Sequence, residues 1–256
     1  MDIKEIKRRA KEDIKPYIKN FIPIILVFIF IDCSLTIPNG VLKYLVRKNH
    51  VELATISNVF NIINGLVEGF ITPILTMALL CLIAKIAKKK DNEEMPEISF
   101  KAFLSHFNMA GRAILNDLYT GLWLFIWAIP AVIVSLIILR ITNSSLGILL
   151  MIILILTVMI YKTLSYYFNS YAIADDNETE VIEAMNISKI ITKGHLREVL
   201  LLDLSFIGWG LLSILTLGFA LIWVQPYMTL SLFYAYQELV KESDSIDVKP
   251  LEEPEV

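Results

Sequence analysis

The residues of this sequence that could do chemistry are polar side chains set inside long apolar runs. One group recurs in steps of three or four residues: Asn58, Asn61, Gly65, Glu68, Thr72 and Thr76. Asn64 lies beside this group. Such steps place side chains on one face of an α-helix. Because an ionised carboxylate in hydrocarbon costs several kcal/mol, this face must line the interior of a helix bundle or a water-filled cavity.

A second group, Lys162, Ser165 and Asn169, has the same spacing, and Asp32 stands alone in an apolar run. At about 1.5 Å per residue from the inner ends of their spans, Asp32 and Lys162 both lie about 15 Å deep. We expect these two to pair, and a three-member cluster with Glu68 is the alternative. Two interpretations stay open: a buried ion pair that fixes helix register, or a path for an ion, a proton or a substrate.

Three further polar residues, His195, Arg197 and Asp203, fall near the cytoplasmic edge of the predicted bundle. A solvated position at a helix end is the expected role for Asp203, as for Asp117. His195 and Arg197 should lie at the cytoplasmic headgroup level. The three histidines lack the H-E-x-x-H spacing, and no G-x-S-x-G or Walker sequence occurs. The two cysteines lie in apolar runs, where we read them as small buried hydrophobic residues. The sequence therefore predicts no catalytic residue, no metal site and no cofactor.

The composition places these residues in a membrane. Of the 256 residues, 56% are hydrophobic and 19% charged, and the mean hydropathy is +0.63. A soluble domain has about 45–50% apolar and about 25% charged residues. These values predict a polytopic membrane protein and exclude an ordinary soluble or disordered chain. A net charge of −3 argues against a nucleic-acid partner, which would need a basic surface.

The apolar runs predict an all-α fold, a bundle of about six transmembrane helices with short amphipathic cytoplasmic helices. The last run, Leu204–Gln237, is too long for one span, and Thr216-Leu217-Gly218 is the expected break. The first span is expected to end or bend at Pro38-Asn39-Gly40. The bundle occupies residues 20–240, with spans near 20–42, 54–85, 113–139, 146–172, 197–215 and 219–240.

Flanking charges predict the orientation. Eighteen Lys and Arg residues fall on one side of these spans and four on the other, so both termini should be cytoplasmic and the protein should lie in the cell membrane, multi-pass. Residues 1–19 should form an amphipathic cytoplasmic segment that lies either on lipid or in solvent. A short helix is expected over 177–193, capped by Asn177 and ended by Gly194. Residues 241–256 should be an acidic, disordered cytoplasmic tail.

The C-terminal half carries a recognisable series of short motifs: Glu183-Ala184, Ser188-Lys189, Lys193-Gly194-His195, Leu202 to Trp209, Leu215 to Gly218, Pro226-Tyr227 and Phe233-Tyr234. In this order the motifs resemble the DUF975 family of bacterial integral membrane proteins of unknown function. The resemblance is strongest over residues 160–240. It implies a multi-spanning membrane protein and no particular activity.

Three functions fit these observations. The sequence favours a non-enzymatic accessory or partner protein in cell-envelope or lipid processes, because no catalytic motif is present. The first alternative is a small transporter or channel that uses the polar intramembrane face. The second is a lipid-acting enzyme, for which only Asp203, His195 and Arg197 could serve. The expected partners are the lipid bilayer and another membrane protein, and the substrate stays open.

Overall fold

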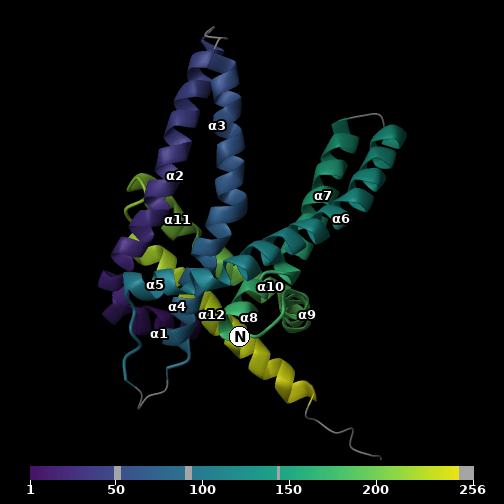
Figure 1. Cartoon of the computed structure of the whole chain (residues 1–256). Coiled ribbons are helices and arrows are strands. Elements are labelled where there is room, and N and C mark those ends of the chain that lie inside the picture. Colours follow the sequence, from purple (N-terminus) through teal and green to yellow (C-terminus); the bar gives the residue numbers. More distant parts are fainter. Residues whose placement is uncertain (49–52, 90–93, 143–144, 248–256) are drawn as a thin grey trace, which may run out of the picture. The chain divides into compact units, whose positions relative to one another are not determined.

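A computed structural model of the chain describes residues 1–48, 53–89, 94–142 and 145–247 (Figure 1). These residues form helices joined by turns and short irregular segments, with no strand among them. The predicted all-α fold is confirmed. The described chain divides into two compact units. Unit 1 holds Met1–Ile6, Leu115–Ser205 and the chain from Leu232 onward, and unit 2 holds Lys7–Ile114 and Phe206–Ser231.

Unit 2 is built around a buried helix, α4 (Thr72–Ala87). From Leu75 onward its residues are buried apart from Thr76 and Lys85. Apolar side chains of other elements, Phe21, Ile24, Ile98 and Phe103 among them, are also fully or almost fully buried. The elements of unit 2 are most of α1 (Ile3–Ile14), η1 (Lys15–Tyr17), α2 (Ile18–Arg47), α3 (Ala54–Leu66), η3 (Val67–Ile71), α4, α5 (Phe100–Ser105), η4 (His106–Met109), α11 (Ile207–Leu215) and the start of α12 (Leu221–Asp247).

Unit 1 has a core of packed aromatic rings. Phe168 lies 5.4 Å from the ring of Tyr171 and 6.0 Å from that of Tyr236, and Phe233 lies 5.7 Å from Tyr236. Edge contacts of this kind stabilise a core beyond the area they bury. The elements of unit 1 are most of α6 (Ala110–Thr142), α7 (Ser145–Ser165), α8 (Asn169–Asp175), α9 (Val181–Thr192), α10 (Leu196–Leu204) and the end of α12.

Five helical segments of the described chain are long and apolar enough to cross a membrane: Ile3–Arg47, Ala54–Ala87, Phe100–Thr142, Ser145–Asp175 and Leu196–Leu215. Protein buries only 6% of the most apolar stretch of Ser145–Asp175. Its side chains therefore need another apolar cover, which a bilayer supplies. The sixth predicted span, 219–240, corresponds to α12, which carries Gln225, several tyrosines and an acidic end. Its place in the membrane stays a prediction.

Several predicted helix boundaries differ from the structure. Helix α2 runs through Pro38 without ending there. Helix α9 begins only at Val181, after Glu180, so Asn177 does not cap it. Helix α12 continues to Asp247, where the sequence predicted disorder from residue 241, because Lys241 and Glu242 are good helix formers. The remaining tail, 248–256, lies outside the described residues.

Two predicted features of the chain do match. The last apolar run breaks where expected, between α11 and α12, and Leu217 and Gly218 there have φ values of 52° and 90°. Helix α1 is amphipathic, with Ile6, Ala10 and Ile14 buried. Because protein covers these three side chains, they are not accessible to lipid.

Candidate functional site

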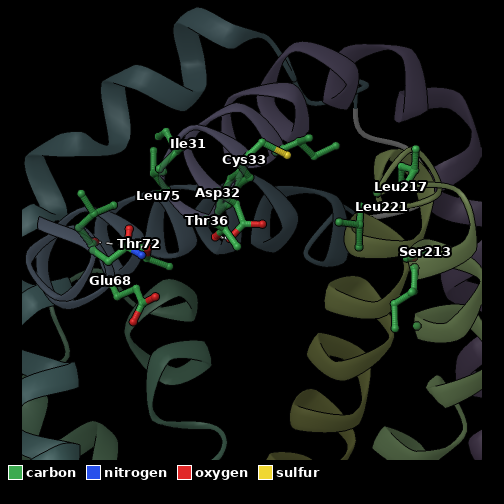
Figure 2. A pocket seen from close by; sticks show the side chains of 17 residues that line it. Ile31, Asp32, Cys33, Thr36, Glu68, Thr72, Leu75, Ser213, Leu217 and Leu221 are labelled. Atoms are coloured by element: carbon green, nitrogen blue, oxygen red, sulfur yellow. Dashed lines mark hydrogen bonds between the residues drawn. The ribbon is translucent and has the colours of Figure 1, made fainter. Parts of the chain in front are cut away.

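Unit 2 contains a cavity of about 600 Å³ that two predicted site residues line. Asp32 comes from α2 and Glu68 from η3, and Figure 2 shows Ser213, Leu217 and Leu221 across the cavity from Glu68. The volume lies within the range of about 300–1,000 Å³ that is typical of small-molecule sites. The full lining is Phe28, Ile29, Ile31, Asp32, Cys33, Thr36, Asn64, Val67, Glu68, Thr72, Leu75, Gly210, Ser213, Ile214, Leu217, Gly218 and Leu221.

The only charged side chains that line this cavity are acidic, and we call it the acidic cavity. Its lining holds two carboxylates and no Lys, Arg or His. The Thr36 hydroxyl donates a hydrogen bond to Asp32 Oδ1 at 3.3 Å, one turn along the same helix. Both carboxylate side chains are exposed to the cavity or its mouth. The arrangement therefore favours a ligand that brings positive charge or N–H donors.

Glu68 is placed by an irregularity in its helix. Between α3 and α4 the chain makes one π-helical turn, η3, in which the Thr72 backbone N–H donates to the Val67 carbonyl. The Thr72 hydroxyl donates to the same carbonyl at 3.4 Å. Pro73 follows at once, and since proline has no N–H, it cannot donate a helical hydrogen bond to the preceding turn. Turns of this kind occur frequently at functional sites.

The residues of the predicted polar face do not all share one surface. Asn64, Glu68 and Thr72 line the cavity, whereas Asn58, Gly65 and Thr76 do not. Asn61 instead accepts a hydrogen bond from the amide of Asn39 on α2, at 3.0 Å. The predicted single face is therefore corrected to two: one that joins α2 to α3, and one that lines the cavity.

The far wall of the cavity depends on the turn between α11 and α12. The Thr216 hydroxyl accepts the Ala220 backbone N–H at 3.0 Å and so closes the turn. Gly218, at φ 90°, adopts a left-handed conformation that suits glycine. Cys33 also lines the cavity and is only half-buried, while Cys81 is buried. The prediction of two buried cysteines holds for Cys81 alone, because the cavity opens beside Cys33.

In unit 1, Lys162 lies against aromatic rings. Its Nζ is 3.4 Å from the centre of the Trp127 ring and 5.4 Å from that of Tyr161. A cation over an aromatic face is stabilised by the ring quadrupole, most strongly by tryptophan. The predicted Asp32–Lys162 pair, and the cluster with Glu68, would each join the two units and stay predictions.

Lys162 and Ser165 both lie in the last turn of α7, but Asn169 does not share their helix as predicted, because α7 ends at Ser165 and α8 begins at Asn169. The buried Ser188 of α9 bridges the gap. Its hydroxyl donates to the Ser165 carbonyl and accepts the Phe168 N–H, each at 3.0 Å. The side chain thus replaces backbone bonds that a continuous helix would make, and the break is stable without water.

Asn169 instead belongs to a polar network between α6 and α8. Its amide donates to the Thr120 hydroxyl at 2.6 Å, and the Asn116 amide donates to the Ser170 hydroxyl at 2.9 Å. Asn116, Thr120 and Ser170 were not predicted from the sequence. Asn116 and Thr120 are four residues apart at the start of an apolar run, and that spacing was the signal that could have found them.

The three cytoplasmic-edge candidates have separate partners. Asp203 accepts the Tyr167 hydroxyl at 2.9 Å. His195 Nδ1 lies 3.2 Å from Glu198, and its Nε2 lies 3.6 Å from Glu242. Arg197 is exposed. No described contact assembles these residues into one site, and no group of three or more His, Cys, Asp or Glu among the described residues could hold a metal ion.

The chain matches a known family. The family described as "Protein of unknown function (DUF975)" matches residues 1–243. No curated protein and no solved structure matches the chain. The match covers both units, so the acidic cavity and the Lys162 region lie within the matched residues.

Proposed function

Because the chain belongs to the DUF975 family, whose function is unknown, its role must come from its own residues, and we propose that it is a multi-pass protein of the cell membrane that binds a cationic or amine-bearing amphiphile in the acidic cavity. Both termini are cytoplasmic in this proposal, as the Lys and Arg distribution favours. The protein then serves cell-envelope or lipid processes as a non-enzymatic accessory protein. The lipid bilayer and a partner membrane protein are its expected contacts.

One observation carries this proposal: Asp32 and Glu68 line the same cavity, and no basic side chain lines it with them. Two carboxylates near apolar walls are costly to keep ionised. A bound ammonium or amine would offset that cost, and its apolar chain would pack on Phe28, Ile31 and Leu221. An amphiphile supplies both parts, and a binding role needs no reacting group in the cavity.

The test is equilibrium binding to protein in neutral phosphatidylcholine nanodiscs. The probe is radiolabelled dodecyltrimethylammonium, with dodecyl sulfate as the anionic counterpart and empty nanodiscs as the background. We expect saturable binding of the cation only. Asp32→Asn and Glu68→Gln should each weaken it about tenfold, the effect of roughly 1.4 kcal/mol of lost attraction. Asn58→Ala, on the same helix but outside the cavity, is the matched control. Equal binding of the two probes, or unchanged binding in both carboxylate variants, would contradict the proposal.

The π-turn at Glu68 favours a second candidate function, transport of the same cation. A π-turn lets one part of a helix shift in register against the next, and discontinuous helices are common in transporters. Proteoliposomes loaded with buffer and given labelled probe outside distinguish the two functions. Uptake that Glu68→Gln abolishes supports transport. Saturable binding without uptake supports the accessory role.

A further inference from the structure

A second charged site lies in unit 1 and is independent of the acidic cavity. Tyr119, Trp123 and Trp127 recur every four residues along α6, a spacing that aligns side chains on one helix face. The rings of Tyr119 and Trp123 meet edge to face at 6.3 Å. We call these three residues the aromatic ladder.

Two lysines from different helices reach the ladder. Lys162 of α7 stands 3.4 Å from the centre of the Trp127 ring. Lys189 of α9 lies 5.4 Å from the centre of Trp123 and 5.5 Å from that of Tyr166. Since Trp123 and Trp127 are neighbours on one face, the two ammonium groups face the same surface.

The lysines bring positive charge together without a carboxylate. Lys189 lies 3.5 Å from the Asn186 side-chain oxygen, and within the described parts of the chain neither ammonium forms an ion pair with Asp or Glu. Both ammonium groups lie over rings of the same helix face, so their positive charges act on one surface. A shared anion would neutralise these charges, which aromatic faces alone do not.

The position of the site selects the kind of anion. Lys162 lies one turn before the end of α7, and Lys189 lies in the last turn of α9. Because α7 ends at Ser165 and not near residue 172, Lys162 lies close to the cytoplasmic end of its helix under the proposed orientation, and not about 15 Å deep as the sequence predicted. This is the headgroup level, where tryptophan and lysine are enriched and the lipids are anionic. Lysine ammonium groups bind phosphate as point charges.

We propose that Lys162, Lys189 and the aromatic ladder bind the phosphate headgroup of an anionic phospholipid of the inner leaflet. The two ammonium groups contact the phosphate, and Trp123 and Trp127 pack beside the glycerol and the upper acyl chains. This site binds an anion, whereas the acidic cavity is proposed to bind a cation. Substitutions can therefore abolish binding at one site and leave binding at the other unchanged.

Tryptophan fluorescence gives a direct test, since two of the four tryptophans lie in the ladder. Trp209→Phe and Trp223→Phe leave Trp123 and Trp127 as the only emitters. The protein is placed in phosphatidylcholine nanodiscs that contain either brominated phosphatidylglycerol or brominated phosphatidylcholine at the same low fraction. We expect the anionic lipid to quench several-fold more strongly, with saturation at a low mole fraction.

The lysine variants assign the effect. Lys162→Gln with Lys189→Gln should bring quenching by the anionic lipid down to that of the neutral lipid, while Lys162→Arg with Lys189→Arg should retain the difference. Lys193→Gln, an exposed lysine just beyond α9, is the control and should have no effect. A variant that fails to fold is recognised by a changed helical circular dichroism spectrum. If the glutamine pair fails to fold, the quenching of the arginine pair is compared with that of Lys193→Gln, and loss of the difference between the two lipids in the arginine pair contradicts the proposal.

Inorganic phosphate distinguishes the two sources of the ligand. If millimolar phosphate leaves quenching by the brominated anionic lipid unchanged, the lipid is the ligand. If phosphate lowers quenching in the parent protein to the level of the Lys→Gln pair, the site takes free phosphate in preference to the lipid and the lipid proposal is wrong. Equal quenching by the two brominated lipids would also overturn it.

Discussion

The acidic cavity and the aromatic ladder accommodate charge among apolar helices by different means. In unit 2, Asp32 and Glu68 line open space, and the Thr36 hydroxyl is a hydrogen-bond partner of Asp32. In unit 1, Lys162 rests on the face of Trp127. One region leaves volume beside its charges, and the other covers a charge with rings. The unit 2 charges are therefore accessible to a ligand, whereas Lys162 also contributes to the packing of its own unit.

Because of this difference, substitutions in the two regions should have different effects on stability and on ligand binding. Substitutions around Lys162 should change the free energy of unfolding, because a packed partner is lost. Substitutions of Asp32 or Glu68 should change binding and leave stability nearly constant, since both carboxylates are exposed.

Trp127→Leu should be the most damaging single change in either region. It replaces the ring beneath the Lys162 ammonium by an aliphatic side chain, at an expected cost of about 2 kcal/mol. Thermal unfolding in detergent, followed by circular dichroism, measures it. Trp127→Phe keeps a ring and should lose clearly less. Equal midpoints for the parent and the leucine variant would show that the cation–π contact contributes no stability.

Ser188→Ala tests the bridge across the break between α7 and α8. The substitution leaves the Phe168 N–H and the Ser165 carbonyl with one partner fewer at a buried position. The expected loss is about 1–2 kcal/mol of unfolding free energy. Ser145→Ala, at an exposed residue of α7, is the control. A loss no greater than that of the control would mean that the break needs no side-chain bridge.

Gly218→Ala tests the far wall of the cavity. At φ 90° a Cβ is strained whatever the space around it, and the expected cost is about 1 kcal/mol. Gly208→Ala is the matched control, since Gly208 lies in helix α11 with nothing within 4 Å of the new Cβ. The first variant should also weaken binding of the cationic probe. If Gly208→Ala is the more damaging variant, the assigned turn is wrong.

Asn61→Ala should have the smallest effect. Its hydrogen bond to Asn39 joins α2 to α3, and such bonds between membrane helices average about 0.6 kcal/mol. A double-mutant cycle with Asn39→Ala isolates this coupling. A coupling energy near zero would leave the α2–α3 contact to apolar packing alone.

The sequence was informative about helices because a charge-free run of about twenty apolar residues rarely forms anything except a membrane helix. It also pointed to Asp32 and Glu68, since a carboxylate in such a run is conspicuous. It placed the helix break at Gly218, where glycine follows threonine and leucine between two apolar stretches. Periodicity placed Asn169 on the helix face of Lys162, but the break after Ser165 puts it in another helix. Periodicity also placed Asn61 with Glu68, although Asn61 pairs with Asn39 on α2.

Long-range partners were beyond the sequence. Nothing in the spacing of Ser188 shows that its hydroxyl bridges Ser165 and Phe168, because that contact depends on how α9 folds back against α7. The Trp127 ring beside Lys162 was equally hidden, since depth in the membrane suggested a carboxylate partner and said nothing of Trp127. The aromatic ladder was visible as a four-residue repeat, but the cations above it come from two other helices.

The acidity of the cavity can be measured at Cys33. A Cys81→Ala variant leaves Cys33 as the only thiol, and in proteoliposomes its modification by a trimethylammonium methanethiosulfonate is compared with that by a sulfonate methanethiosulfonate. Each rate is divided by the rate of the same reagent with a free thiol in solution. The corrected rate of the cationic reagent should be about tenfold higher or more, and Asp32→Asn with Glu68→Gln should remove the difference. Equal corrected rates in the protein with both carboxylates intact would show that the cavity does not select for positive charge.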